Sequence, residues 1–141
     1  VSSALKNEKS NRSSTNPNQN QENIRGAAMH VVRELGDWKH FDAENLHEFR
    51  LKVKALRYTL QLDENADPDL VAALGDVQRR IGDWHDWQQL AEIAHAVLHL
   101  EEDKPLVDRI EQTARRRFDH ARAAAHKLSG KYLAMPVARY V

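Results

Sequence analysis

The sequence predicts an all-α protein, an antiparallel four-helix bundle preceded by a flexible polar leader. In four segments the apolar residues recur at spacings of three and four, the period of an amphipathic helix, and no segment alternates as a strand does. The 141 residues include only five Gly and four Pro, so few positions interrupt long helices. About a hundred residues suffice for one hydrophobic core, and we therefore predict a single domain.

The chain divides into a leader, a helical bundle and a short tail. Residues 1–22 are rich in Ser, Asn and Gln and nearly free of aliphatic side chains, which predicts a flexible leader that cannot bury a core. We assign residues 23–133 to the bundle and residues 134–141 to a C-terminal tail. Because the chain begins with Val rather than Met, we expect a fragment or a processed product.

Capping residues mark the first two helices. The apolar pattern predicts a helix from about Asn23 that Gly36 closes. Asp42 is a good N-cap for the second helix, which we expect to bury a stripe that includes Phe49 and to end near Leu62.

The third and fourth helices are predicted in the same way. Asp67 followed by Pro68 is typical of an N-cap with Pro at the first helical position, and the apolar pattern continues as far as Leu100. The chain restarts at Lys104-Pro105 and is predicted to end its last helix at a C-cap formed by Ser129-Gly130.

Composition excludes several classes of function. The chain has no cysteine, which rules out disulfides, thiolate nucleophiles and Cys-based zinc sites and fits the cytoplasm, where we expect the protein. No stretch approaches the roughly 18 apolar residues that a membrane span needs. There is no P-loop, no glycine-rich phosphate cradle and no recognisable Ser/His/Asp order, so we predict neither an enzyme nor a bound cofactor or metal.

The net charge of zero hides a strong segregation of charge along the chain. Residues 47–58 and 109–127 are predominantly basic, whereas residues 63–76 carry five acidic residues and no basic one. Local fields rather than net charge steer an anion toward a protein, so the basic segments are candidates for an anion-binding surface.

Four cationic or titratable side chains align on the second predicted helix. At 100° per residue, His47, Arg50, Lys54 and Arg57 project within a sector of roughly 80° along about 15 Å of helix axis. Lys52 points away from them, toward solvent. Guanidinium groups bind phosphate oxygens bidentately, so this row suits an extended polyanion. The alternative is a solvated face that acidic side chains from adjacent helices neutralise.

The third predicted helix carries a pattern with the same spacing, formed by Gly75, Gln78, Gly82 and His85. Two glycines on one face allow another helix or a ligand to approach the backbone closely. The polar side chains favour the second wall of a shallow polar groove. The alternative is close helix–helix packing with hydrogen-bonded polar residues.

Two segments in this order resemble the signatures of CHAD domains, the conserved-histidine α-helical domains. Residues 46–58 read LHEFRLKVKALRY, which is similar to a family helix with His, Arg three residues on, Lys four further on and then Leu-Arg-Tyr. Residues 74–86 read LGDVQRRIGDWHD, which is similar to the second signature, Leu-x-x-x-Gln-x-x-x-Gly-x-x-His/Asn-Asp. The resemblance covers roughly residues 24–130.

The resemblance implies binding of inorganic polyphosphate, in the cytoplasm and in association with polyphosphate granules, without chemistry. The residues that it places at the phosphate are His47, Arg50, Lys54 and Arg57, with Tyr58, Gln78 and His85 in positional roles. By charge alone, four arginines could extend the basic surface: Arg79, Arg80, Arg115 and Arg116.

A full CHAD domain resembles two four-helix bundles around a basic channel, and this chain has one copy of the signatures. It therefore resembles one half, the C-terminal one. Either the chain is a fragment or a diverged half-domain, or a homodimer rebuilds the two-bundle channel.

Other classes of function remain open. A nucleic-acid backbone would also suit the basic row, although interleaved aromatic residues for base stacking are lacking apart from Tyr58. Glu92, His95 and His99 have a spacing that can ligate metals in bundles, but no second Glu-x-x-His completes such a site. A purely structural interaction module would use an exposed patch at Trp84 and Trp87.

Overall fold

The computed structural model describes residues 16–133, and over this range the chain consists of helices and their connections, without a strand. The all-α prediction is confirmed. Four α-helices, one 3-10 helix and one π-helical turn follow in this order: α2 (Pro17–Gly36), α3 (Leu46–Gln61), α4 (Pro68–Val97), η1 (Glu101–Asp103), α5 (Lys104–Leu128) and η2 (Ser129–Leu133). Residues 1–15 of the predicted leader and the predicted tail 134–141 lie outside the described residues.

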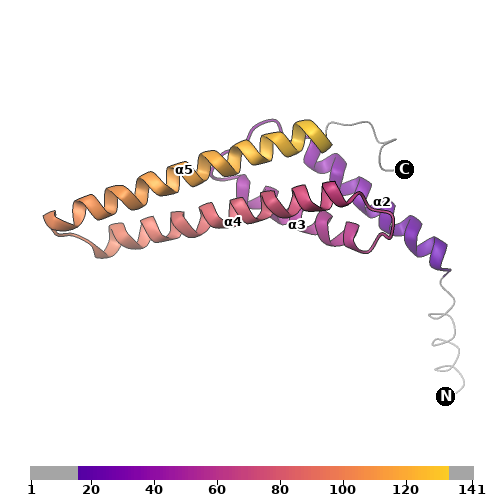
Figure 1. The fold of residues 1–141 in the computed structure, drawn as a ribbon, viewed down its shortest axis with the longest axis horizontal. Coiled ribbons are helices and arrows are strands. Elements are labelled where there is room, and N and C mark those ends of the chain that lie inside the picture. Colours follow the sequence, from indigo (N-terminus) through magenta and orange to yellow (C-terminus); the bar gives the residue numbers. More distant parts are fainter. Residues whose placement is uncertain (1–15, 134–141) are drawn as a thin grey trace, which may run out of the picture.

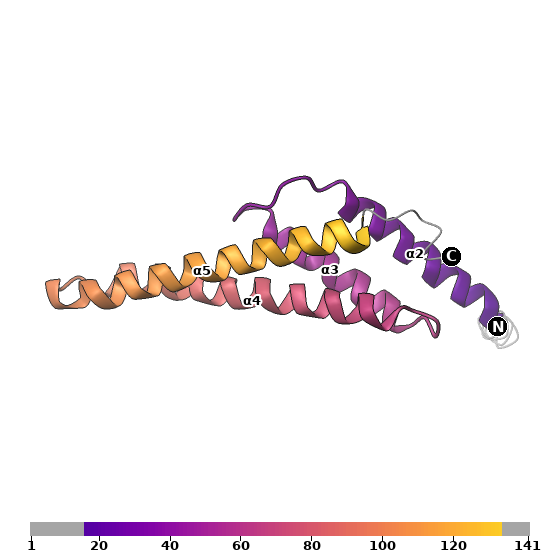
Figure 2. The ribbon, with the colours of Figure 1, turned by 45° about the horizontal axis from the view of Figure 1, so that its top comes forward.

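The longest helices, α4 and α5, form a hairpin on which the rest of the chain packs. Helix α3 lies along the first half of α4, and α2 packs on α3 and on η2 (Figure 1). The second half of α4 and the first half of α5 extend beyond α2 and α3 in both views (Figures 1 and 2). The helices therefore overlap fully only at one end of the hairpin.

The buried side chains follow this arrangement. The larger hydrophobic cluster draws on all four α-helices and η2, and its largest fully buried members include Phe49, Leu56 and Leu74. In the extended half of the hairpin the buried cluster contains only Ala91, Ala94 and Ile110. Trp84 belongs to the larger cluster and is 4 % exposed, so it does not form the exposed patch considered for it.

Helix α2 begins earlier than the apolar pattern predicts, and the predicted start at about Asn23 is wrong. The Asn16 side chain accepts a hydrogen bond from the Asn18 N–H, and Pro17 occupies the first turn. Capping chemistry of this kind starts a helix even where few side chains are buried. Residues 17–22, assigned to the leader, are therefore helical, and Gln21 donates a hydrogen bond to the Leu62 carbonyl.

The N-cap predicted for the second helix is wrong, whereas the one predicted for the third helix is confirmed. Helix α3 starts at Leu46 with Asn45 at its cap position, and the Asp42 carboxylate instead accepts hydrogen bonds from the N–H groups of Glu44 and Asn45 in the preceding turn. Asp67 caps α4 through the Asp69 N–H, with Pro68 in the first turn, as predicted.

The predicted ends of the first two helices are confirmed, since α2 ends at Gly36 and α3 ends at Gln61, next to Leu62. Helix α4 stops at Val97, and Leu98 is extended, so the apolar pattern to Leu100 overestimates its length. Helix α5 ends at Leu128 with Ser129 as its C-cap, as predicted, but the chain continues as η2 instead of turning away at Gly130. The burial of Tyr132 and Leu133 in the larger cluster favours continued winding over a left-handed glycine cap.

An aromatic cluster fixes the connection between α2 and α3. The Phe41 and Phe49 rings meet edge to face with centroids 4.6 Å apart, and the Trp38 ring lies 5.5 Å from that of Phe49. Phe41 also contacts the His126 ring on α5. This packing holds the start of α3, and with it the basic row, against the core.

Among the described helices, none combines the length and the apolar character that crossing a bilayer requires.

Candidate anion-binding groove between α3 and α4

The two polar patterns predicted on separate helices face each other in the structure. Helices α3 and α4 are joined by a short connection and run antiparallel, so the later residues of α3 meet the early residues of α4. Arg57 lies against Gly75 and Arg50 lies against Gly82. At the far end of the row the His47 and His85 rings stack with centroids 5.4 Å apart.

Gln78 lies between the two arginines and hydrogen-bonds to both. The Arg50 Nε donates to the Gln78 backbone carbonyl at 3.1 Å, and the Arg57 Nη1 donates to the Gln78 side-chain Oε1 at 3.3 Å. One residue of α4 therefore orients both guanidinium groups, and each hydrogen bond uses only one of the nitrogens of its guanidinium.

The glycines of α4 create the space that the arginine side chains occupy. A Cβ added at Gly75 would lie 3.3 Å from the Arg57 Nε, and one added at Gly82 would lie 3.2 Å from the Arg50 Nη2. None of the described glycines has a positive φ, so backbone conformation does not require glycine here. The face of α4 that carries Gly75 and Gly82 had two interpretations, a groove wall or a helix-packing seam. In the structure, the two glycines lie against the guanidinium groups of Arg57 and Arg50 rather than against another backbone.

Replacing Gly82 with Ala should separate stability from ligand binding. Ala gains up to about 1 kcal/mol in helix propensity, while its methyl group, 3.2 Å from the Arg50 Nη2, forces the guanidinium to shift by a few tenths of an ångström relative to the Gln78 carbonyl. We expect an unchanged or raised midpoint of thermal unfolding and a weaker affinity for the anionic ligand. The control is Gly26→Ala on α2, where an added Cβ meets nothing within 4 Å. Equal affinities of the two variants would contradict a positioning role for Gly82.

Arg50 and Arg57 line an open groove of about 760 Å³ whose carboxylates are committed elsewhere. Asp63 pairs with Arg25 at 3.6 Å, and Asp76 pairs with Arg79 and Arg80. Within residues 16–133, Arg50, Lys54 and Arg57 have no ion-pair partner. The alternative of a face neutralised by acidic neighbours is not realised in this part of the chain.

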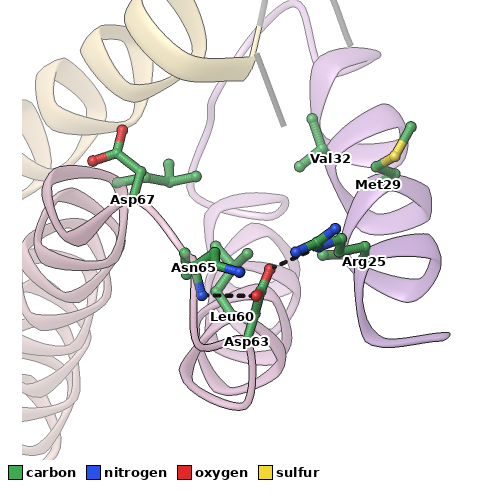
Figure 3. Close-up of a pocket in the computed structure, with 10 residues that line it drawn as sticks. Arg25, Met29, Val32, Leu60, Asp63, Asn65 and Asp67 are labelled. Carbon is green, nitrogen blue, oxygen red and sulfur yellow. Dashed lines mark hydrogen bonds and ion pairs between the residues drawn. The ribbon is translucent and has the colours of Figure 1, made fainter. Parts of the chain in front are cut away.

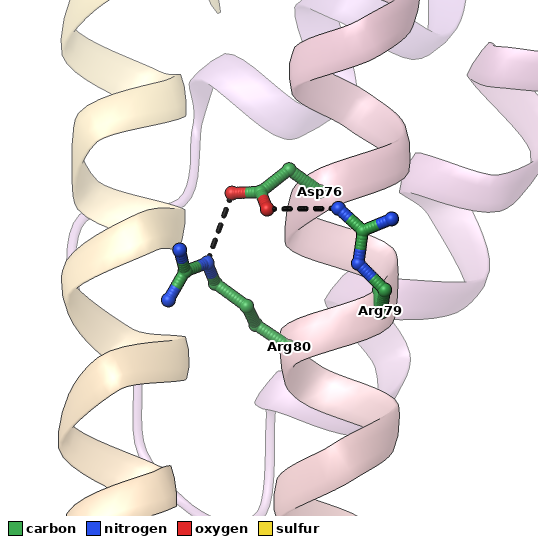
Figure 4. Close-up of polar contacts among 3 residues, drawn as sticks. All are labelled: Asp76, Arg79 and Arg80. Carbon is green, nitrogen blue, oxygen red and sulfur yellow. Dashed lines mark hydrogen bonds and ion pairs between the residues drawn. The ribbon is translucent and has the colours of Figure 1, made fainter.

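Asp76 binds two of the arginines predicted to extend the basic surface. Its carboxylate accepts from the Arg79 Nη2 at 3.1 Å and from the Arg80 Nε at 2.9 Å, and the two arginines lie on either side of this carboxylate (Figure 4). Burial raises the pKa of Asp76, but the hydrogen bonds and charges of Arg80 and Arg79 together outweigh it and hold the pKa below its ordinary value. The three side chains together keep a net positive charge.

Arg57 is placed at a cost in stability. Its Nε is buried against Gly75 and has no hydrogen-bond acceptor in the described residues. A buried donor without an acceptor costs about 1–3 kcal/mol. The hydrogen bond from the Arg57 Nη1 to Gln78 offsets part of this cost.

Lys54, Tyr58 and Lys52 lie outside the groove. The Lys54 Nζ lies 5.8 Å from the centroid of the half-exposed Tyr58 ring on the same helix. The predicted orientation of Lys52 toward solvent is wrong, because its Nζ bonds to Glu34 of α2. That hydrogen bond raises the pKa of Lys52 and lowers the pKa of Glu34.

The arginines Arg115 and Arg116 are not brought to the groove, because they lie on the part of α5 that α3 does not reach. Arg115 is 4.0 Å from Glu111, and Arg116 donates to the Thr113 hydroxyl.

The sequence patterns did not predict the role of Asp76, which binds both Arg79 and Arg80. The available signal was a carboxylate three and four residues before two arginines on one helix.

Two other candidate sites have less support. His95 pairs with Glu111, and no group of three or more His, Asp or Glu side chains in residues 16–133 is placed to hold a metal ion.

A cavity of about 170 Å³ lies between α2 and the connection after α3, beside the Arg25–Asp63 ion pair (Figure 3). This volume is below the roughly 300 Å³ at which ligand pockets begin.

Comparison with family models, curated proteins and solved structures finds no match to this chain.

Proposed function

We propose that this protein binds inorganic polyphosphate in the groove between α3 and α4, without chemistry. The observation that carries the proposal is the pair of guanidinium groups of Arg50 and Arg57, oriented by Gln78 and free of carboxylate partners within the described residues. Oriented guanidinium groups are suited to charge-assisted hydrogen bonds with phosphate oxygens. A repeating anion also offsets the repulsion between like charges along one helix.

Polyphosphate is favoured over nucleic acid by the side chains that line the groove. Within residues 16–133 no Phe, Trp or Tyr ring lines the groove, so a base would find no such ring on which to stack. The open groove suits a linear anion that presents only phosphate oxygens. Nucleic-acid binding and a purely structural interaction module are the alternative functions.

The family and the assembly belong to the same proposal. We assign the chain to the CHAD domains as one antiparallel four-helix half, on the two signatures in residues 46–58 and 74–86. Because the groove is open on one side, a second copy related by a twofold axis would supply the opposite wall. We further propose a cytoplasmic location in association with polyphosphate granules.

Competition between polyphosphate and DNA tests the proposed function. We expect fluorescently labelled polyphosphate to bind at about 0.15 M ionic strength and to be displaced by unlabelled polyphosphate far better than by DNA of equal total charge. Sedimentation of the same mixtures reports whether one or two chains hold the ligand. DNA that competes as well as polyphosphate would contradict the proposed selectivity, and a monomer in all mixtures would contradict the assembly.

A further inference from the structure

A second groove lies on a neighbouring face of α4, between α4, α5 and η2. Its volume is about 430 Å³, and its floor contains small apolar residues such as Ala73, Val77 and Ala124. Its basic residues come from three elements, namely Arg80 on α4, His120 and Lys127 on α5, and Lys131 on η2. His120 and Lys127 belong to the basic segment 109–127, whereas Lys131 lies outside it.

The charge in this groove is poorly compensated. Among the described residues that line it, Asp76 is the only acidic one, and Asp76 is already bound by Arg79 and Arg80. In the part of the chain that the structure describes, His120, Lys127 and Lys131 have no ion-pair partner. Cations from separate elements that gather without a carboxylate favour an anionic ligand.

The groove suits a linear anion better than a nucleotide. The small side chains of its floor keep it shallow and open. The groove lining includes the aromatic residue Tyr132, which is only 6 % exposed. The Lys131 Nζ lies over the Tyr132 ring, 5.3 Å from its centroid. That ring is therefore poorly placed to stack with a base.

Asp76, Arg79 and Arg80 connect this groove with the one between α3 and α4. Asp76 lines both grooves, Arg79 lines the groove on the α3 side, and Arg80 lines the groove on the α5 side (Figure 4). Each arginine uses one nitrogen for Asp76, so other N–H groups of both remain for a ligand. The distance to cross is about one helix diameter, roughly 10 Å.

We propose that the groove between α4 and α5 binds the continuation of a long polyphosphate chain that crosses α4 over Arg79 and Arg80. This inference rests on the proposed function, and it adds a substrate class: chains long enough to occupy both grooves. Short phosphates are held by the α3–α4 groove alone. Lys127 and Lys131 thereby contribute to the affinity for long chains and not to the affinity for short ones.

The test measures the affinities for tripolyphosphate and for long-chain polyphosphate by calorimetry. The variants are Lys127→Glu/Lys131→Glu in the second groove and Arg109→Glu/Arg116→Glu as the control. The control has the same change of net charge at exposed positions of α5 that line neither groove. Relative to the control, we expect the second-groove variant to bind long chains roughly tenfold more weakly, the effect of losing a charge-assisted contact. Its affinity for tripolyphosphate should match that of the control.

The other outcomes separate this inference from the proposed function. If Arg50→Glu weakens binding of both ligands but the second-groove variant equals its control, the proposed function stands and the second groove is wrong. If the second-groove variant weakens tripolyphosphate as much as long chains, the groove is not a continuation of the first. Wild-type protein that binds neither ligand would overturn the proposed function itself. Circular dichroism spectra establish that all variants are folded.

Discussion

Replacing Arg50 with Glu is expected to lower the affinity for polyphosphate by roughly tenfold to a hundredfold, the range for a lost hydrogen bond between charged groups. Arg50 is half-buried between α3 and α4, and its Nε is fixed on the Gln78 carbonyl, so its guanidinium is oriented before the ligand arrives. Glutamate removes the donors and places a like charge beside the phosphates. Titration of labelled polyphosphate at several salt concentrations measures both the loss and the expected shallower salt dependence.

The control for Arg50→Glu is Arg116→Glu, which makes the same change of net charge on the exposed face of α5. Long-range electrostatics affects both variants, whereas a direct contact affects only the first. Equal losses of affinity would show that the groove is not the contact surface. Retention of the wild-type circular dichroism spectrum by Arg50→Glu excludes unfolding as the cause.

Replacing Phe49 with Ala is expected to lower the free energy of unfolding by about 3–5 kcal/mol, the usual cost of removing a buried aromatic side chain. Phe49 is 0 % exposed and packs on Trp38 and Phe41, so its loss opens a cavity and loosens the connection between α2 and α3. Because a domain of this size is stabilised by only about 5–15 kcal/mol, part of the population could unfold. Urea denaturation followed by circular dichroism measures the change.

Leu51→Ala on the same helix is the matched control for Phe49→Ala. Its side chain is 50 % exposed, and we expect a loss of less than about 1 kcal/mol. The pair also tests the orientation of α3, since the two residues are neighbours on different faces. A larger loss for Leu51→Ala than for Phe49→Ala would mean that the helix buries the opposite face.

The all-α fold class and the starts of α4 and α5 could be predicted because they depend on local chemistry. Asp67 and Pro68 begin α4 by capping and by the fixed φ of proline, which a short stretch of sequence reveals. The apolar pattern does not reveal the start of α2 at Pro17, because the Asn16 cap sets it and the first turns of the helix are largely exposed. The extended half of the α4–α5 hairpin could not be foreseen, because how far helices overlap depends on packing between distant segments.

The candidate groove could be predicted only in part, because some of its features depend on local sequence and others on packing between helices. Helical periodicity alone aligned Arg50 with Arg57 and Gly75 with Gly82 on their own helices. The register between the helices, which places each arginine on a glycine, is a tertiary property. Whether a cation is free to bind a ligand also depends on its neighbours in space: Lys52 is paired by Glu34 from α2, whereas Arg50 has no such partner in the described residues.

The extended half of the hairpin has a consequence for the dynamics of the protein. Its buried cluster consists of Ala91, Ala94 and Ile110, and two of these side chains bury very little area. Elements with few buried apolar contacts open locally at a lower free energy than the rest of a domain. Amide hydrogens of residues 88–97 should therefore exchange with deuterium faster than those of residues 70–84 in the same helix, so that one continuous helix contains two separately opening units.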